Sequence, residues 1–504
     1  MSGKAKFPLK VSPVYAISGA FFGLLAFSAR NGEEKMKLIY RPSDKPTPKK
    51  TLVFAIQQLL AIMAATIAVP AQINQIYPEA AMSSAAALFG AGAGTLIYLL
   101  FTKFKSPVFL GSSFAFIGSM LAAFGGAVTM YIGHLAFIIG AVLAGLVYVA
   151  LAITVKYAGV EWINKLMPPV VIGPTVALIG LSLSSAAVNG IFHYVPKGQS
   201  GFEMTTNLWL TFICALVTLF VVVITSTYGK KMAKLIPFII GILAGYAVAL
   251  IFTVIGYIAD APSLIVIDFS PFKALVADGV TIRTFLDVPD FTFVFAVKGF
   301  KDMTWGYFAT IAAAYLPVAF VVFAEHIADH KNLSSIIEED LLKDPGLDKT
   351  LLGDGVGSMV GAFFGGCPNT TYGESVGCVA ITKNASIITI IVTAFMSMGI
   401  SFISPFVAFL STIPACVMGG VCVTLYGFIA VSGLKMIQKV DLENSANLFT
   451  VSAILIPGIG GLALTIVEGV TITNIACALI LGILVNVTLS TIGKKLGAKN
   501  NDEE

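Results

Sequence analysis

Charge and cysteine are both scarce in this sequence, and each shortage excludes a class of protein. Only 12% of the 504 residues are charged, which is about half the share in an ordinary soluble domain and excludes a soluble enzyme. The six cysteines form no Cys-x-x-Cys pair and lie mostly inside apolar runs, so neither a disulfide framework nor a metal site is indicated. The net charge of +4 is too small to indicate nucleic-acid binding.

Long apolar runs take the place of charge. Fourteen segments are apolar and suited to crossing a bilayer, which takes roughly 20 residues. The third and the tenth are short and interrupted by polar or small residues, at Gly111–Ser113 and Asn369–Gly373. We therefore predict an all-α polytopic membrane protein with short extended segments in these two broken spans. The fourteen spans are 51–70, 82–101, 108–124, 132–155, 169–188, 206–227, 235–257, 305–328, 350–366, 369–382, 385–409, 413–431, 447–467 and 473–492.

The positive charges test this count, because Lys and Arg concentrate in cytoplasmic loops. With the N-terminus inside, no Lys or Arg lies within a span, and all but five fall in inner segments. An even number of spans then puts both termini in the cytoplasm, so we predict a multi-pass protein of the cytoplasmic membrane. Counting the apolar stretch 11–29 as another span would spoil this distribution, so residues 1–50 are interpreted as a cytoplasmic or interfacial extension. The five outer residues are Lys197, Lys273, Arg283, Lys298 and Lys301.

The fourteen spans divide into two sets of seven, and an odd number per half makes the halves enter the membrane from opposite sides. This division predicts an inverted repeat. Residues Pro168–Gly173 resemble Pro414–Gly419, and the broken span is the third in each half. In such repeats the broken segments meet near the bilayer midplane, where free backbone N–H groups can hold a polar solute. Close packing through Gly and Ser is the alternative role of these residues.

Carboxylates within the apolar spans indicate where that solute binds. Glu325 and Glu374 lie in spans 8 and 10, and Asp329 follows the end of span 8. A carboxylate at the bilayer centre costs about 2.5–3.5 kcal/mol on insertion scales, and no span offers a Lys or Arg as partner. Glu325 and Asp329 share one face if their helix continues past residue 328. Such acids suit proton coupling; a structural hydrogen-bond network between two domains is the alternative.

Other polar and small residues near these acids are assigned structural roles. We expect Asp354 to hydrate or cap the entrance of span 9. His326 and His330 are expected at the membrane interface, because no third metal ligand accompanies them. A row of glycines spaced four apart on span 9 predicts a packing face; its members are Gly357, Gly361 and Gly365.

A neutral planar solute with N–H groups beside carbonyl groups fits such a cleft. Carboxylates accept hydrogen bonds from the N–H groups, and backbone N–H groups at the breaks donate to the carbonyl oxygens. Hydrogen bonds to charged groups contribute about 1.5–3 kcal/mol each, so two acids select against analogues that lack the N–H groups. A nucleobase has this pattern. Phe114, Phe116 and Tyr372 are the candidate aromatic residues for stacking.

Several motifs closely resemble those of the nucleobase–ascorbate transporter family, in its uracil-transporting branch. Four of them lie in the second half, at Ala324–Lys331, Lys343–Leu347, Leu352–Gly355 and Pro368–Glu374. The similarity extends to Gly111–Phe116 and Val417–Gly420 and covers about residues 36–495.

The resemblance implies a fourteen-span inverted repeat that forms a dimer and carries a nucleobase with protons as the coupling ion, without a cofactor. It also implies two domains, each built from both halves. A core domain comprises 51–155 and 305–409, and a gate domain comprises 169–257 and 413–492. The remaining parts are the extension 1–50, an extracellular loop at 258–304 and a cytoplasmic tail at 493–504.

The family's functional positions map onto individual residues of this chain. Glu325 and Glu374 correspond to the two acids that bind the pyrimidine, and Phe114, Tyr372 and Gly373 correspond to ring or backbone contacts. Asp329 occupies a position linked to proton coupling.

Two residues depart from the family pattern. Gln58 stands where the family has His, and Ser375 stands where it has Asn. We assign proton coupling to Glu325, Asp329 and the position of Gln58, although a Gln cannot titrate. No catalytic residue or metal ligand is expected.

The prediction is therefore a uracil–proton symporter rather than an enzyme. Glu at position 374 resembles the uracil branch more than the purine branch. Transport of xanthine, thymine or another nucleobase is one alternative, and an anion transporter of the same architecture is a second. An aspartyl protease using Asp329 and Asp354 is disfavoured, because Gly353–Gly355 differs from the expected Gly-x-Gly-Asp order.

Overall fold

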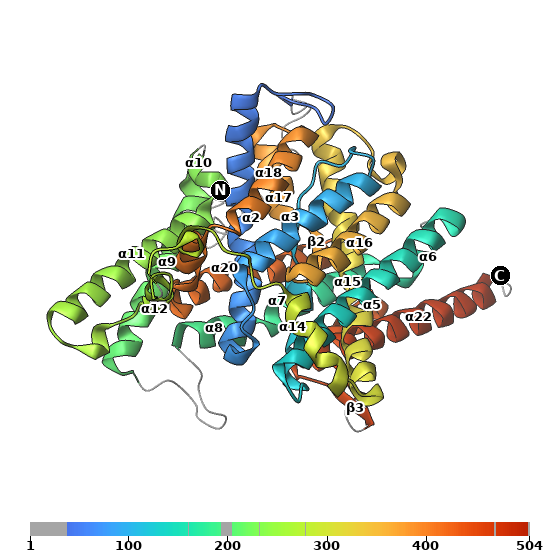
Figure 1. Cartoon of the computed structure of the whole chain (residues 1–504). Coiled ribbons are helices and arrows are strands. Elements are labelled where there is room, and N and C mark those ends of the chain that lie inside the picture. The colour runs from blue at the N-terminus through green and yellow to red at the C-terminus, as the bar shows by residue number, and fades with distance from the viewer. Residues whose placement is uncertain are drawn as a thin grey trace, which may run out of the picture.

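Long apolar helices make up most of the protein (Figure 1). The computed structural model describes residues 38–159, 161–192, 204–230, 232–277, 279–467 and 470–501. Nine helices in these ranges are long and apolar enough to cross a membrane, which confirms the predicted helical membrane protein. They are α2 (Pro48–Ile76), α3 (Ser84–Phe101), α5 (Met130–Ala158), α7 with α8 (Pro169–Ser182, Ser184–Phe192), α9 (Thr206–Tyr228), α11 (Pro237–Ile258), α15 (Trp305–Ile337), α20 (Ala415–Ile437) and α22 (Asn474–Asn501).

Shorter elements fill the other predicted spans and the connections. The spans contain η3 (Phe114–Phe116), α4 (Ile117–Gly125), α16 (Leu347–Phe364), α17 (Gly373–Thr382), α18 (Ile387–Ile400), α19 (Ser404–Ser411) and α21 (Ser445–Ile459). The connections contain η2 (Pro78–Ala80), α6 (Glu161–Leu166), α10 (Met232–Leu235), η4 (Pro262–Leu264), α12 (Ser270–Ala274), α13 (Ile282–Phe285), α14 (Thr292–Ala296), η5 (Val297–Asp302) and η6 (Leu342–Gly346).

The two broken spans form a two-stranded sheet inside the protein. Strand β1 (Leu110–Ser112) pairs antiparallel with β2 (Asn369–Thr371), and Gly111 lies opposite Thr370. All six residues are buried, so the pairing satisfies backbone groups that lipid would leave without partners. The predicted extended segments in spans 3 and 10 are therefore present, and they meet each other.

Element ends differ from the sequence prediction in three places. Helix α15 continues to Ile337, nine residues past the predicted end of span 8. Span 13 ends in strand β3 (Leu464–Val467), which pairs with β4 (Val470–Ile472), because β-branched residues favour strands. Helix α22 continues to Asn501 through most of the predicted tail. Residues 1–37 of the predicted extension, the last residues 502–504 and Lys197 lie outside the described residues.

The helices pack in two groups. In the first group, α3 packs on α16 and α18, and α5 packs on α15 and α16. In the second group, α20 packs on α7, α8 and α9, and α21 packs on α7 and α22. Figure 1 shows α9 and α11 to one side of the molecule and α16 to the other. The contacts between the groups are fewer and involve mainly α2 and α15.

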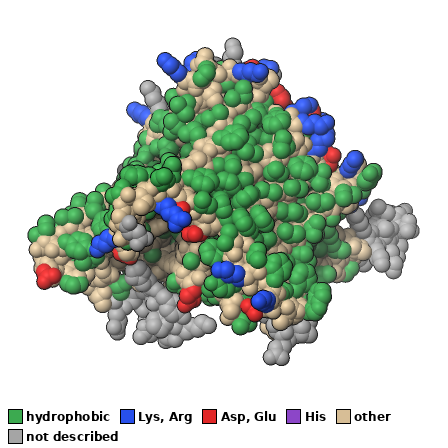
Figure 2. Space-filling model, in the orientation of Figure 1, with side chains coloured by type: hydrophobic (Ala, Val, Ile, Leu, Met, Phe, Trp, Pro, Cys, Tyr) green, Lys and Arg blue, Asp and Glu red, His purple; other side chains and the backbone are tan. Residues whose placement is uncertain are grey.

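The outer surface is suited to lipid. Figure 2 shows a face that is mostly hydrophobic over its middle, with Lys and Arg gathered towards its edges. Large apolar side chains are exposed along α9 and α11, among them Phe220, Ile224, Ile251 and Val254. An apolar surface of this extent is rare on soluble monomers and agrees with helices that contact lipid.

The predicted glycine face of α16 lies against α3. A Cβ added at Gly357 would lie 2.7 Å from the carbonyl oxygen of Gly94, and one added at Gly361 would overlap the Asn369 side chain. Absence of a Cβ therefore lets the two helices approach closely and brings Asn369 of β2 against α16. This contact confirms the prediction of a packing face.

Replacing Gly357 with Ala is expected to destabilise the protein by about 1–3 kcal/mol, because the added methyl group must push α3 and α16 apart. The measurement is the midpoint of thermal unfolding in detergent. Gly399→Ala is the matched control, because Gly399 is also helical and has no atom within 4 Å of an added Cβ. Equal midpoints for the two variants would contradict the packing argument.

Candidate functional site

Helix α15 supplies two of the candidate acids. No Gly or Pro interrupts the helix between Val318 and Ile337, so Glu325 and Asp329 lie on the same helical face, one turn apart. Glu325 is exposed and Asp329 is half-buried. The Thr371 hydroxyl on β2 donates a hydrogen bond of 2.8 Å to Asp329 Oδ2. Asp329 thus lies inside the helix and is tied to the broken span.

Helix α17 supplies the third acid. Gly373 and Glu374 are its first residues and are separated from β2 only by Tyr372, so the carboxylate lies at a helix N-terminus, which favours negative charge. Gly373 is exposed, and a Cβ there would lie 3.9 Å from Asp329 Oδ1. The carboxyl groups of Glu325, Asp329 and Glu374 lie within electrostatic range of one another. The structure therefore brings the three sequence-predicted acids together.

The aromatic candidates differ in what they can offer a ligand. Phe114 is half-buried, and its ring meets Tyr426 of α20 edge-on at 5.8 Å, so it lies where the two helix groups meet. Tyr372 is buried, and its hydroxyl donates to the Ser112 carbonyl at 2.9 Å. Phe116 stacks on the buried ring of Tyr315. Phe114 is thus the aromatic side chain best placed for a ligand, and Tyr372 can contribute its backbone.

The two departures from the family pattern contact each other. Gln58 Nε2 on α2 donates a hydrogen bond of 2.6 Å to Ser375 Oγ, which also accepts one of 2.9 Å from the backbone N–H of Phe109. Both side chains are buried. This cluster joins α2, the approach to β1 and the first turn of α17, next to Glu374. The structure thus places Gln58 next to the acid cluster, where it donates a hydrogen bond to the residue that follows Glu374.

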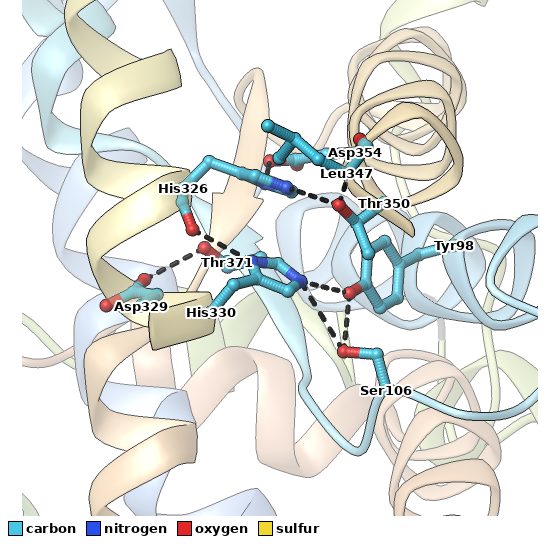
Figure 3. A network of polar contacts seen from close by, with 9 residues as sticks. All are labelled: Tyr98, Ser106, His326, Asp329, His330, Leu347, Thr350, Asp354 and Thr371. Atoms are coloured by element: carbon cyan, nitrogen blue, oxygen red, sulfur yellow. Dashed lines mark hydrogen bonds and ion pairs between the residues drawn. The ribbon is translucent and has the colours of Figure 1, made fainter. Parts of the chain in front are cut away.

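The expectation that His326 and His330 are interfacial is wrong, and so is the placement of Asp354 at a hydrated span entrance. All three side chains are buried. His326 Nδ1 lies 2.6 Å from Asp354 Oδ2, and its Nε2 lies 3.0 Å from Thr350 Oγ1 on α16 (Figure 3). Each histidine follows an acid by one residue, which turns it about 100° around α15. The acids and the histidines therefore form two separate rows.

His330 extends this network towards α3. Its Nδ1 donates to the His326 carbonyl at 2.8 Å, and its Nε2 lies 2.7 Å from the Tyr98 hydroxyl (Figure 3). Tyr98 donates to Ser106 Oγ at 2.7 Å. The two imidazole rings stack with their centroids 4.0 Å apart. The sequence contains one signal for this network. His326 and His330 are four residues apart and so share a helical face, and Asp354 lies in a glycine-rich span that can pack closely against another helix.

Comparison with known proteins identifies the family. Residues 49–467 match the family described as the permease family. The chain belongs to this permease family. This permease is 37% identical over 458 residues to the uracil permease of Bacillus subtilis (strain 168), covering 90% of this chain and 96% of the relative. It is 32% identical over 444 residues to the uracil permease of Escherichia coli (strain K12), covering 88% and 91%. The family resemblance found in the sequence is confirmed.

Solved structures share the fold of this permease. The transmembrane domain of a cyanobacterial bicarbonate transporter, BicA, aligns with a TM-score of 0.55 at 15% identity, covering 90% of this chain and all of that one. The anion transporter Slc26a9 of mouse aligns with a TM-score of 0.57 at 12% identity, covering 97% and 74%. The curated relatives are named as permeases rather than enzymes, which agrees with the prediction for this chain.

Proposed function

We propose that this permease takes up uracil across the cytoplasmic membrane together with protons. The observation that carries the proposal is the convergence of Glu325, Asp329 and Glu374 on the paired broken spans, close to the place where the two helix groups meet. Relatives that match nearly the whole chain are named uracil permeases. Because no Lys or Arg lies in the predicted spans, the acids are available to protons and to N–H groups of a solute.

In this proposal Glu325 and Glu374 accept hydrogen bonds from the N–H groups of uracil. Each carboxylate accepts a charge-assisted hydrogen bond, and the Gly373 backbone at the start of α17 approaches the base without a side chain in the way. The carbonyl oxygens of the base accept from backbone N–H groups at the breaks, including those next to Tyr372 and Phe114. The Phe114 ring covers one face of the base.

The packing supports the proposed seven-plus-seven inverted repeat. If the halves are equivalent, the equivalents of two spans that touch should also touch. The main helix contacts follow this rule. The pairs α3 with α16, α7 with α20 and β1 with β2 map onto themselves. Contacts of α5 with α15 and α16 map onto those of α18 with α2 and α3, and α9 with α11 maps onto α21 with α22. Both α7 and α20 also follow a proline N-cap, Pro168 and Pro414.

The transport cycle uses the two helix groups as the core and gate domains. The first group holds the acids and the broken spans, and it moves as a body against the second group while it carries the base. Glu325 and Asp329 bind protons outside and release them inside. Gln58 contributes to coupling through Ser375 and the start of α17. The permease is a homodimer in this proposal, with both termini in the cytoplasm as the charge distribution indicates.

Uptake of labelled uracil by proteoliposomes tests the proposed function. With the outer side of the protein more acidic, a gradient of one pH unit, about 1.4 kcal/mol per proton, is expected to support up to about tenfold accumulation if one proton accompanies each uracil. Collapse of the gradient by a proton ionophore is expected to abolish the accumulation. Equal uptake with and without the gradient would refute proton coupling.

Two alternatives give different results in the same assay. If another nucleobase is preferred, unlabelled xanthine or thymine competes more strongly than unlabelled uracil. An anion transporter is suggested by the solved structures that share the fold. Three clustered carboxylates repel anions, so the uracil proposal expects bicarbonate to leave uracil uptake unchanged.

A further inference from the structure

A small cavity lies beside Asp354. It is lined by residues of α5, α15, α16 and β2, including Tyr148, Val322, Asp354 and Asn369. The cavity offers about 10 Å³ to a water molecule, which is close to the space that one water needs.

Three polar atoms of the residues that line this cavity have no hydrogen-bond partner in the described part of the chain. Among the described residues, no hydrogen bond reaches the Tyr148 hydroxyl, Asp354 Oδ1 or Asn369 Oδ1. The Thr370 hydroxyl also lacks a partner of hydrogen-bond geometry, although it lies beside both Tyr148 and Asp354. All four residues are buried. Each orphaned atom costs about 1–3 kcal/mol, and one water can bond three or four such atoms. Water is therefore the occupant that the lining fits.

The contacts of His326 determine where its protons lie. Thr350 has a single hydroxyl proton, and its Oγ1 lies 3.1 Å from the Leu347 carbonyl, which can only accept. If Thr350 donates to Leu347, it must accept at its 3.0 Å contact with His326 Nε2, so Nε2 carries a proton. The 2.6 Å contact between His326 Nδ1 and Asp354 Oδ2 then needs a second proton, on either atom.

We propose that His326 and Asp354 share one proton in a buried pair, and that a single water in the adjoining cavity satisfies Asp354 Oδ1. The pair has no net charge whether the shared proton lies on nitrogen or on oxygen. This neutrality allows Asp354 to be buried without Lys or Arg, which an ionised carboxylate in an apolar interior would require. The pair is a proton-binding site separate from Glu325, Asp329 and Glu374.

The pair and the acid cluster lie against neighbouring residues of β2. Thr370 lies beside Asp354, and the next residue of β2, Thr371, donates to Asp329. We therefore assign the pair a part in proton coupling, which rests on the proposed function. The titratable groups that face the pair are Glu325, Asp329 and His330 of α15, Tyr98 of α3 and Tyr148 of α5.

Nitrogen NMR of the full-length permease tests the shared proton without reference to transport. The chain has only four histidines, His134, His193, His326 and His330, and a His326→Gln sample assigns the signals of interest. We expect His326 to carry a proton on Nε2, either as that neutral tautomer or as the doubly protonated ring. A neutral ring protonated on Nδ1 alone would overturn the proposal, because Asp354 would then be ionised and no proton would be shared.

Asp354→Asn tests the coupling role, because the amide fits the same space and can donate to His326 Nδ1. We expect this variant to exchange labelled for unlabelled uracil and to lose accumulation driven by a pH gradient. Accumulation within twofold of the native level would overturn the coupling role. Loss of exchange as well would also contradict it, by placing Asp354 in binding or folding. If the native permease itself fails to accumulate uracil, the proposed function fails while the NMR result still decides the shared proton.

Discussion

Replacing Glu374 with Gln is expected to weaken uracil binding about 10- to 100-fold, which corresponds to losing one charge-assisted hydrogen bond of about 1.5–3 kcal/mol. The substitution keeps the size of the side chain and its place in the first turn of α17. It removes the charge, so the amide oxygen can still accept from a substrate N–H group, but the contact is no longer charge-assisted. Competition by xanthine is expected to strengthen relative to uracil. Equilibrium binding of labelled uracil to purified protein is the measurement.

The control for this variant is Glu339→Gln. Glu339 is exposed just past the end of α15, and its replacement changes the net charge by the same amount. Its binding constant is expected to match that of the native protein. Unchanged uracil affinity in the Glu374 variant would show that Glu374 does not bind uracil. Glu325 would then be the acid that binds the base.

Much of this fold could be predicted from the sequence because lipid imposes strict rules on length and charge. Apolar segments of membrane-spanning length and the absence of Lys and Arg from them indicated the helices that the structure contains. The interruptions at Gly111–Ser113 and Asn369–Gly373 indicated β1 and β2, because backbone cannot leave a helix in a membrane without finding other partners. The spacing of Glu325 and Asp329 indicated a shared face, since helical geometry is local.

The partners of these residues were beyond the reach of such local rules. Gln58 contacts Ser375 across 317 positions of sequence, and Tyr98 contacts His330 across 232. Helical periodicity in the sequence shows which residues share a face of a helix, but it does not show which other helix packs against that face. The sequence therefore predicts the membrane interface for the histidine row of α15, whereas these histidines contact α16 and α3. The end of α15 also differs from the prediction, because the residues after Asp329 are mostly polar and lie outside the apolar span, although they remain helical.

Replacing Asp329 with Asn is expected to abolish proton-driven accumulation while uracil still binds. The Asn carbonyl oxygen can accept the hydrogen bond from Thr371 that Asp329 now accepts at 2.8 Å, so the contact between α15 and β2 is kept. Only the exchangeable proton and the charge are lost. With an inward gradient of one pH unit, the accumulation ratio is expected to fall from up to about ten, the limit for one proton per uracil, to one. Labelled uptake in proteoliposomes measures this ratio.

Asp441→Asn is the matched control, because Asp441 is an exposed aspartate whose Oδ1 accepts a backbone hydrogen bond of 3.0 Å from Glu443. That bond also survives the substitution, so the variant is expected to accumulate uracil as the native protein does. Proton-driven accumulation that persists in the Asp329 variant would show that Asp329 holds β2 in place without carrying a proton. Coupling would then lie with Glu325, Glu374 or the buried pair of His326 and Asp354, because each of these can still bind a proton.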